Sequence, residues 1–197
     1  MTLAIGLFRL PSQSEQIGDP YFAALEVLIL FMMPLLVTLM AAVHAGAPLR
    51  AKAFTLTSLI FTGLLTGLTM GVHFVVLVVS RQAAFTQLVW LPMLISFKWP
   101  SIAYVLDILA WDVFFALAVL FAQEAFQGGR VAAWIRLLMI ASGVLALAGL
   151  SGVAVGDMRL RNIGIIGYAG AFPVAAGLLA LLFWKAKPER SLVKCES

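Results

Sequence analysis

The chain has 197 residues, of which 63% are hydrophobic and only 11% charged, and its formal net charge is +4. So few charged side chains cannot cover the surface of a water-soluble globule of this size. Composition therefore excludes a soluble domain and indicates an integral membrane protein.

Long apolar segments dominate the chain and have the length that a membrane span needs. A hydrocarbon core of about 30 Å requires roughly 20 apolar residues in a helix. The segments are continuous rather than alternating, which favours helices over the strands of an outer-membrane barrel. We therefore predict an all-α integral membrane protein, a bundle of five transmembrane helices. The predicted spans are residues 20 to 44, 53 to 80, 101 to 126, 131 to 155 and 162 to 184.

A further apolar piece, residues 85–97 (FTQLVWLPMLISF), is too short to cross the membrane comfortably. It contains Trp90 and Pro92 and is followed by Lys98, and Trp and Lys favour the membrane interface. We predict an interfacial or re-entrant segment here. The expected domain organisation is an amphipathic and polar N-terminal arm, a single transmembrane helical domain and a basic C-terminal tail, over residues 1–19, 20–185 and 186–197.

Five spans place the two termini on opposite sides of the membrane. Of the 13 Lys and Arg residues, eight fall on the side of the C-terminus and five on the other side, where Arg159 and Arg161 are assigned to an external loop. The excess of basic residues predicts a cytoplasmic C-terminus and an external N-terminus in the plasma (inner) membrane. The basic tail suits an anionic lipid surface, and no nucleic-acid partner is expected without a folded basic domain.

Several kinds of chemistry lack the residues that they require. The single cysteine, Cys195, allows neither a CxxC redox pair nor an intrachain disulfide, and no lysine lies within a predicted span to hold retinal. The sequence contains no Gly-rich phosphate loop, no HExxH and no GxSxG. His44 and His73 lie near opposite ends of the spans, too far apart to share one haem iron. We therefore expect no cofactor and no metal.

Four polar residues in four different spans fall at one depth. Counted along each helix, Glu26, His73, Asp107 and Tyr168 all lie roughly 10 Å below the external surface. A lone carboxylate in lipid costs several kcal/mol, whereas a partnered one costs much less. The four residues therefore predict a buried site, with Asp107, Glu26 and His73 as its candidate catalytic residues.

Helical angle separates the two aspartates of the third span. Tyr104, Asp107 and Trp111 share one face, while Asp112 points about 140° away from Asp107 and lies near the midplane. We therefore expect the aspartates not to form a catalytic pair, and Asp112 to have Thr66 at its depth as partner. The candidate substrate-binding residues are Tyr104, Trp111, Asp112, Tyr168 and Asn162.

The second span carries a polar stripe of threonines that ends at His73, and a glycine face beside it. The glycines form a GxxxGxxxG pattern, which allows another helix to approach closely. We expect both features to face the interior of the bundle. The glycines are Gly63, Gly67 and Gly71, and the threonines are Thr55, Thr62, Thr66 and Thr69.

A carboxylate, a tryptophan and a histidine around an apolar cavity form a type of site that is similar to those of membrane-embedded sterol isomerases and terpene cyclases, with no aligned motif. The favoured hypothesis is a small membrane enzyme that performs acid/base chemistry, of the isomerisation or cyclisation type, on a lipophilic substrate. The alternatives are a proton-coupled transporter and a structural or assembly subunit of a larger membrane complex. No inverted repeat is visible, although a homo-oligomer could supply a second half for transport.

Overall fold

The computed structural model describes residues 19–82, 84 and 87–185 of the chain. Within these residues all the regular structure is helical, and five helical segments have the length and composition needed to cross a membrane. The prediction of an all-α membrane bundle with five spans is confirmed. Most of the expected N-terminal arm and the whole C-terminal tail lie outside the described residues. The five segments are Tyr21–Gly46, Leu49–Val79, Ile102–Ala125, Arg130–Val155 and Asn162–Lys185.

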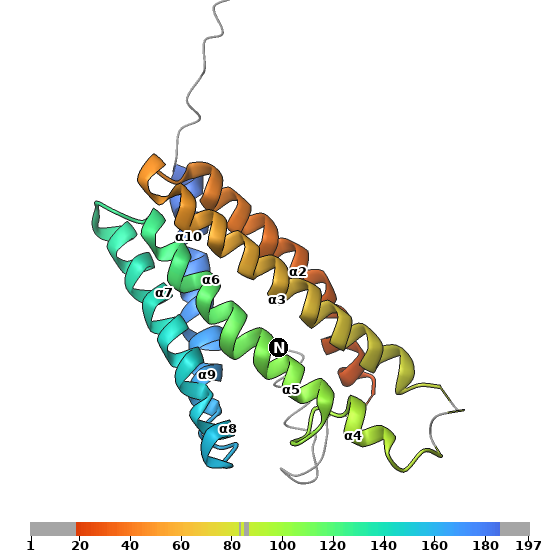
Figure 1. Ribbon diagram of the computed structural model, residues 1–197. Coiled ribbons are helices and arrows are strands. Elements are labelled where there is room, and N and C mark those ends of the chain that lie inside the picture. Colours follow the sequence, from red (N-terminus) through yellow and green to blue (C-terminus); the bar gives the residue numbers. More distant parts are fainter. Residues whose placement is uncertain (1–18, 83, 85–86, 186–197) are drawn as a thin grey trace, which may run out of the picture.

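The first two spans form a long helical hairpin. The helices α2 (Tyr21–Gly46) and α3 (Lys52–Val79) are joined by the short turn η1 (Leu49–Ala51) and run side by side (Figure 1). Their apolar residues are continuous along the chain, so both helices can bury one side against the bundle and expose the other to lipid. The α2 helix packs mainly against α3, and the hairpin is joined to the rest of the bundle largely through α3.

The third and fifth spans are each interrupted by one π-helical turn. Such turns contain an additional residue in a helix and occur frequently at functional sites. The third span consists of α5 (Ile102–Ile108), the π-helical η3 (Leu109–Phe114), α6 (Phe115–Ala122) and η4 (Gln123–Ala125). The fourth consists of α7 (Arg130–Gly149) and α8 (Ser151–Val155), and the fifth of α9 (Asn162–Ile165), the π-helical η5 (Ile166–Ala171) and α10 (Phe172–Lys185).

The segment between the second and third spans contains only one short helix, α4 (Leu91–Ile95), among its described residues. Its five residues are far too few to cross a bilayer, as expected for an interfacial or re-entrant segment. In Figure 1, α4 lies at the same end of the bundle as α5 and the turn between α8 and α9. We call this the α4 end, and the end that carries η1 the η1 end.

Close packing between the fourth and fifth spans depends on glycine. A Cβ atom added at Gly167 would lie 2.5 Å from the carbonyl oxygen of Ser142, and one added at Gly149 would lie 3.0 Å from Cα of Gly164. Such distances leave no room for a side chain, so the backbones of α7 and the fifth span touch directly. The hydroxyl of Ser142 uses this proximity to donate a hydrogen bond of 2.7 Å to the carbonyl of Gly167.

The glycine face of the second span does not pack in this way. Gly63, Gly67 and Gly71 are exposed, and Cβ atoms added at these positions would have no neighbour within 4 Å among the described residues. The expectation that this face lies inside the bundle is therefore wrong. The neighbours of α3 lie on its threonine side, where Thr62 and Thr69 are fully buried, so the glycines point outward.

Candidate functional site: a buried ion network

A buried ion pair joins the two helices of the hairpin at the α4 end. Glu26 lies in the second turn of α2 and His73 in the penultimate turn of α3, and both side chains are buried. Nδ1 of His73 lies 2.7 Å from Oε2 of Glu26. A carboxylate inside the hydrocarbon layer needs such a partner. The antiparallel course of the two helices brings together residues that are 47 positions apart.

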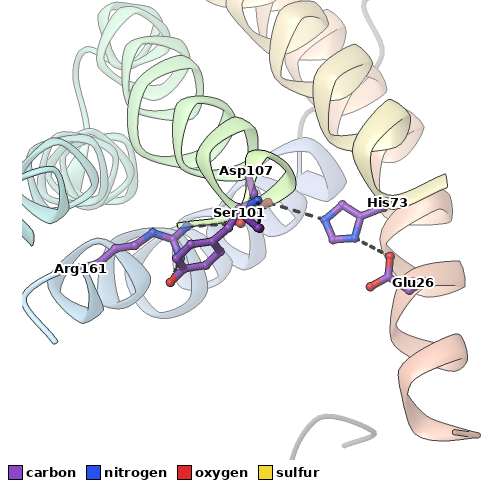
Figure 2. Close-up of polar contacts among 6 residues, drawn as sticks. Glu26, His73, Ser101, Asp107 and Arg161 are labelled. Atoms are coloured by element: carbon purple, nitrogen blue, oxygen red, sulfur yellow. Dashed lines mark hydrogen bonds and ion pairs between the residues drawn. The ribbon is translucent and has the colours of Figure 1, made fainter. Parts of the chain in front are cut away.

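The same histidine extends the contact to the third span. Its other ring nitrogen, Nε2, lies 3.6 Å from Oδ1 of Asp107 in α5. Figure 2 shows the imidazole of His73 between the carboxylates of Glu26 and Asp107. The phenyl ring of Phe97 stacks on the imidazole with 4.8 Å between ring centroids, so the segment that follows α4 covers the histidine.

The start of α5 is fixed by a serine cap. The hydroxyl of Ser101 accepts a hydrogen bond of 3.2 Å from the backbone N–H of Tyr104 and donates one to the carbonyl of Ser96. Ser, Thr, Asp and Asn are the preferred residues at this position because their side chains satisfy a free N–H of the first turn. The cap sets where α5 begins and thereby the depth of Tyr104 and Asp107.

Arg161 binds both aspartates of the third span and is almost fully buried, with 4% of its surface exposed. Its Nε lies 3.1 Å from Oδ2 of Asp112, and its Nη2 lies 3.3 Å from Oδ2 of Asp107. Its Nη1 donates a 3.0 Å hydrogen bond to the Tyr104 hydroxyl, and the guanidinium lies 4.6 Å from the centre of that ring. The planar fork of arginine suits such simultaneous contacts. We call Glu26, His73, Asp107, Asp112 and Arg161 the ion network.

Arg161 remains protonated in this setting. Burial acts to lower the pKa of Arg161, but the nearby acidic groups Tyr168, Asp112, Tyr104 and Asp107 outweigh it and raise that pKa above its usual range. The side chain is therefore a permanent cation. It supplies a fixed positive charge between two carboxylates in a region that excludes water.

A tight turn between α8 and α9 carries Arg161 into the bundle. Helix α8 ends at Val155 and is followed by Gly156, whose φ of 78° is readily adopted by glycine alone. A Cβ atom added at Gly152 would lie 2.8 Å from the backbone nitrogen of Arg161, so glycine is required for the turn to close on α8. Arg161 was not among the predicted site residues, because the span boundaries assigned it to an external loop. The available signal was charge balance, because three carboxylates within the spans need more positive charge than His73 provides.

The expected separation of the two aspartates is also wrong. The 140° angle assumes an α-helix, whereas η3 is a π-helical turn with i→i+5 bonding, in which residues five apart come closer to one side. The 140° angle therefore does not hold across η3, and both carboxylates bind Arg161. Thr66 is not the partner of Asp112, since its hydroxyl has no hydrogen-bond partner among the described residues.

Asp112 retains one oxygen atom that is buried and unbound. Oδ1 has no hydrogen-bond partner in the described part of the chain, and no part of the side chain is exposed. A Cβ atom added at Gly164 would lie 2.6 Å from this oxygen, so α9 closes over the carboxylate with only backbone between them. Oδ1 is consequently a position in the ion network where a further proton displaces no existing hydrogen bond, as is Nε2 of His73.

Two of the aromatic candidates, Trp111 and Tyr168, make no hydrogen bond to the ion network in the described part of the chain, whereas Tyr104 contacts Arg161 directly. The rings of Trp111 and Tyr168 are 5.2 Å apart between centroids, and Tyr168 also packs edge-on against Phe115 at 6.1 Å. Asn162, another candidate, starts α9 with an exposed side chain. Trp111 and Tyr168 form one wall of an apolar pocket of about 350 Å³. The remaining lining residues are Met32, Leu35, Leu36, Leu39, Phe172, Pro173 and Ala176.

Fold and site together define a multi-pass helical membrane protein in which a buried ion network joins the first three spans to the turn that begins the fifth, at one end of the bundle. No family model, curated protein or solved structure matches the chain. Residues 19–82, 84 and 87–185 contain no group of three or more His, Cys, Asp or Glu placed to hold a metal ion.

Proposed function

We propose that the protein is a small membrane-embedded enzyme that performs acid/base chemistry on a lipophilic substrate. The observation that carries this proposal is an apolar pocket whose lining includes two residues close to the ion network, although no member of the network lines it. Trp111, which lines the pocket, is the chain neighbour of Asp112, and Tyr168, which also lines it, is close enough to Arg161 to affect the pKa of that side chain. An apolar cavity next to convergent polar groups is typical of a small-molecule site.

The charge balance of the ion network supports a role in proton transfer. Three ionised carboxylates carry −3, whereas Arg161 and a protonated His73 carry +2, which leaves −1. A net charge is costly in hydrocarbon, so binding one more proton makes the network neutral. The free oxygen Oδ1 of Asp112 can hold that proton without losing a contact.

An isomerisation requires one group that donates a proton and one that accepts a proton, and the ion network contains candidates for both. The protonated network donates a proton to one carbon of a double bond, and an ionised carboxylate of the network removes a proton from another carbon. One proton is added and one is removed, so the number of protons in the network is unchanged and no electrons leave the substrate. A proton transfer from the base to the acid, through the contact between His73 and Asp107, then restores the initial state. Asp107 and Asp112, held by Arg161, are the proposed acids, and the Glu26–His73 pair is the proposed base.

The depth of the ion network favours this enzyme over a proton-coupled transporter. Asp112 is its deepest member, and toward the η1 end the described parts of the spans contain no further ionisable side chain before the level of His44, Glu124 and Arg136. Proton relays through membranes use chains of ionisable residues. Ionisable groups that reach only from the α4 end to Asp112 suit an enzyme better than a proton relay across the membrane. From the distribution of basic residues, we propose that the α4 end faces outward in the plasma membrane and the C-terminus lies in the cytoplasm.

Deuterium exchange tests the proposal with a mixture of lipids in place of a chosen substrate. The purified protein in lipid nanodiscs is incubated with a total lipid extract in deuterated water, and the recovered lipids are analysed by mass spectrometry. We expect the wild-type protein to introduce deuterium at a C–H position of one lipid class, and Asp107→Asn to abolish this incorporation. Arg159→Gln, in an exposed residue near the same end, is the control. No incorporation by the wild type, or equal incorporation by Asp107→Asn, would contradict the proposal.

A further inference from the structure

Two threonines of α3 have hydroxyl groups that the described part of the protein does not satisfy. Thr55, Thr57 and Thr62 each donate a hydrogen bond to the backbone carbonyl four residues earlier. The hydroxyl oxygens of Thr66 and Thr69 are buried and have no hydrogen-bond partner among the described residues. A buried hydroxyl without a partner is costly, and in folded proteins such groups are bound by protein atoms or by ordered water.

The two hydroxyls lie on the same face of α3 as His73. Residues 66, 69 and 73 are spaced three and four apart, so they follow one another along about 10 Å of the helix. Nε2 of His73 is also buried and has no hydrogen-bond partner in the described ranges. Oδ1 of Asp107 lies 3.6 Å from it, which is too long for a direct hydrogen bond. A polar contact of this length is often bridged by water.

At the same level, the π-helical turn of the third span releases a backbone carbonyl. Helix α3 packs against α5, η3 and α6 of this span. The N–H of Phe115 bonds to the carbonyl of Ala110, five residues earlier. The carbonyl of Trp111 therefore lacks the donor that it would have in an α-helix. The two helices are antiparallel and His73 meets Asp107, so position 111 comes level with Thr69.

Aromatic rings bound this row of unpartnered groups at both ends. Phe97 stacks on the imidazole of His73 at the α4 end. Toward the η1 end, the rings of Phe61 and Phe114 pack with 6.3 Å between centroids. Ala110, which is buried at the level between, has only a methyl side chain, so no long side chain from that position competes with a small ligand. The unpartnered groups are therefore confined to one stretch of the interface, about two helical turns long.

We infer that ordered water molecules bind between α3 and the third span, held by the hydroxyls of Thr66 and Thr69, Nε2 of His73 and the carbonyl of Trp111. Water matches this set because a hydroxyl both donates and accepts, an imidazolium N–H donates and a carbonyl accepts. A buried water molecule typically makes about three hydrogen bonds, and the row offers partners of both kinds. The presence of this water does not depend on the proposed function.

One of these water molecules bridges His73 and Asp107 and carries protons between them. The imidazolium passes its proton to the water while the water passes another proton to the carboxylate of Asp107, so the water is regenerated and no proton is lost. Thr69 acts as a positioning residue, because its hydroxyl holds the water one helical turn from the imidazole. This role in proton transfer rests on the proposed function, and it joins the proposed base to the proposed acid.

Water-edited solid-state NMR in proteoliposomes tests for the bound water. The method measures how fast magnetisation passes from water protons to individual side chains. We expect the signals of Thr66 and Thr69 to gain magnetisation several times faster than those of Thr62. Thr62 is the matched control, because it is as buried as Thr69 but donates its hydroxyl to the carbonyl of Ser58. Equally slow transfer to all three threonines would overturn the inference.

The sign of a stability change distinguishes a hydrated interface from a dry one. Valine has the shape of threonine without the hydroxyl, so Thr69→Val removes one ligand of the water. It should raise the equilibrium constant of unfolding in detergent micelles about 3- to 10-fold, the effect of one hydrogen bond. In a dry interface the same variant would remove an unsatisfied hydroxyl and stabilise the fold, and that result would overturn the inference. Thr69→Ser keeps the hydroxyl and should preserve fast magnetisation transfer to Thr66.

The role in proton transfer is tested separately with the deuterium assay. Thr69→Val should slow deuterium incorporation at least about tenfold, and Thr69→Ser should restore most of the rate. An unchanged rate in Thr69→Val would overturn the role of the water in proton transfer. No incorporation by the wild type, together with fast magnetisation transfer to Thr66 and Thr69, would contradict the proposed enzyme and confirm the bound water.

Discussion

Asp112 accepts a 3.1 Å hydrogen bond from Nε of Arg161, a residue 49 positions away in the sequence, and neither residue has more than 4% of its surface exposed. This pair fastens the third span to the turn that begins the fifth. Because Arg161 also binds Asp107, the two carboxylates depend on one cation for their charge compensation. The stability of the α4 end should therefore be more sensitive to Arg161 than to any other basic residue near it.

Arg161→Gln should lower the free energy of unfolding by about 3 to 5 kcal/mol, because it leaves the buried Asp112 and the partly buried Asp107 without their cation. Reversible unfolding in mixed detergent micelles measures the change. Arg159→Gln alters an exposed residue of the same turn and should cost less than about 0.5 kcal/mol. Equal losses for the two variants would show that Arg161 is not buried in an ion pair.

A double-mutant cycle should detect direct coupling between Arg161 and Asp112. Asp112→Asn alone removes one partner of the guanidinium, while Arg161→Gln alone leaves the carboxylate unpaired. The combined variant removes both charges, so it should be more stable than the sum of the single losses by about 1 to 3 kcal/mol. The same unfolding assay gives all four free energies. Simple additivity would contradict the contact.

Glycine substitutions should distinguish packed from open helix surfaces. Gly164→Ala places a methyl group 2.6 Å from Oδ1 of Asp112 and should destabilise the fold by about 1 to 3 kcal/mol. Gly67→Ala adds a methyl group in open space and should be neutral or stabilising by up to about 1 kcal/mol, because alanine favours helices. Thermal unfolding in detergent compares the two. A large loss at Gly67 would indicate that another helix covers this face.

Ser101→Ala should loosen the start of the third span. The substitution removes the acceptor for the backbone N–H of Tyr104 and the donor to Ser96, at a cost of about 1 kcal/mol. Hydrogen exchange should increase at the first turn of α5. Ser151→Ala, at an exposed serine with no side-chain cap role, is the matched control and should leave exchange at α5 unchanged.

The spans and part of the site were predictable because both depend on depth. An apolar segment long enough to cross the bilayer has few alternatives to a transmembrane helix, so the five spans follow from composition. The depth of a side chain below the membrane surface also follows from the position of its residue along a span. The sequence therefore placed Glu26, His73 and Asp107 in one layer, and the structure brings these three side chains into contact.

The remaining features depend on geometry that one-dimensional patterns do not contain. The α-helical angle misplaced Asp112, because a π-helical turn leaves no clear mark on hydrophobic periodicity. Arg161 enters the bundle through the close approach of Gly152, a contact between segments whose arrangement was not known. The glycine face of α3 was misplaced for the same reason. Its pattern indicates a surface that permits close approach, but it does not indicate whether a neighbour is present.

The hairpin of α2 and α3 supplies Glu26 and His73, while the other three spans and their turns supply Asp107, Asp112 and Arg161. The ion network crosses from one part to the other only through the 3.6 Å contact between His73 and Asp107. With a neutral imidazole both parts carry −1 and repel across this boundary, whereas a protonated imidazole makes the hairpin neutral and removes the repulsion. Protonation of His73 thus strengthens the association between the hairpin and the other three spans, and loss of that proton weakens it. Proton transfer and the packing of the spans are therefore coupled at this one contact.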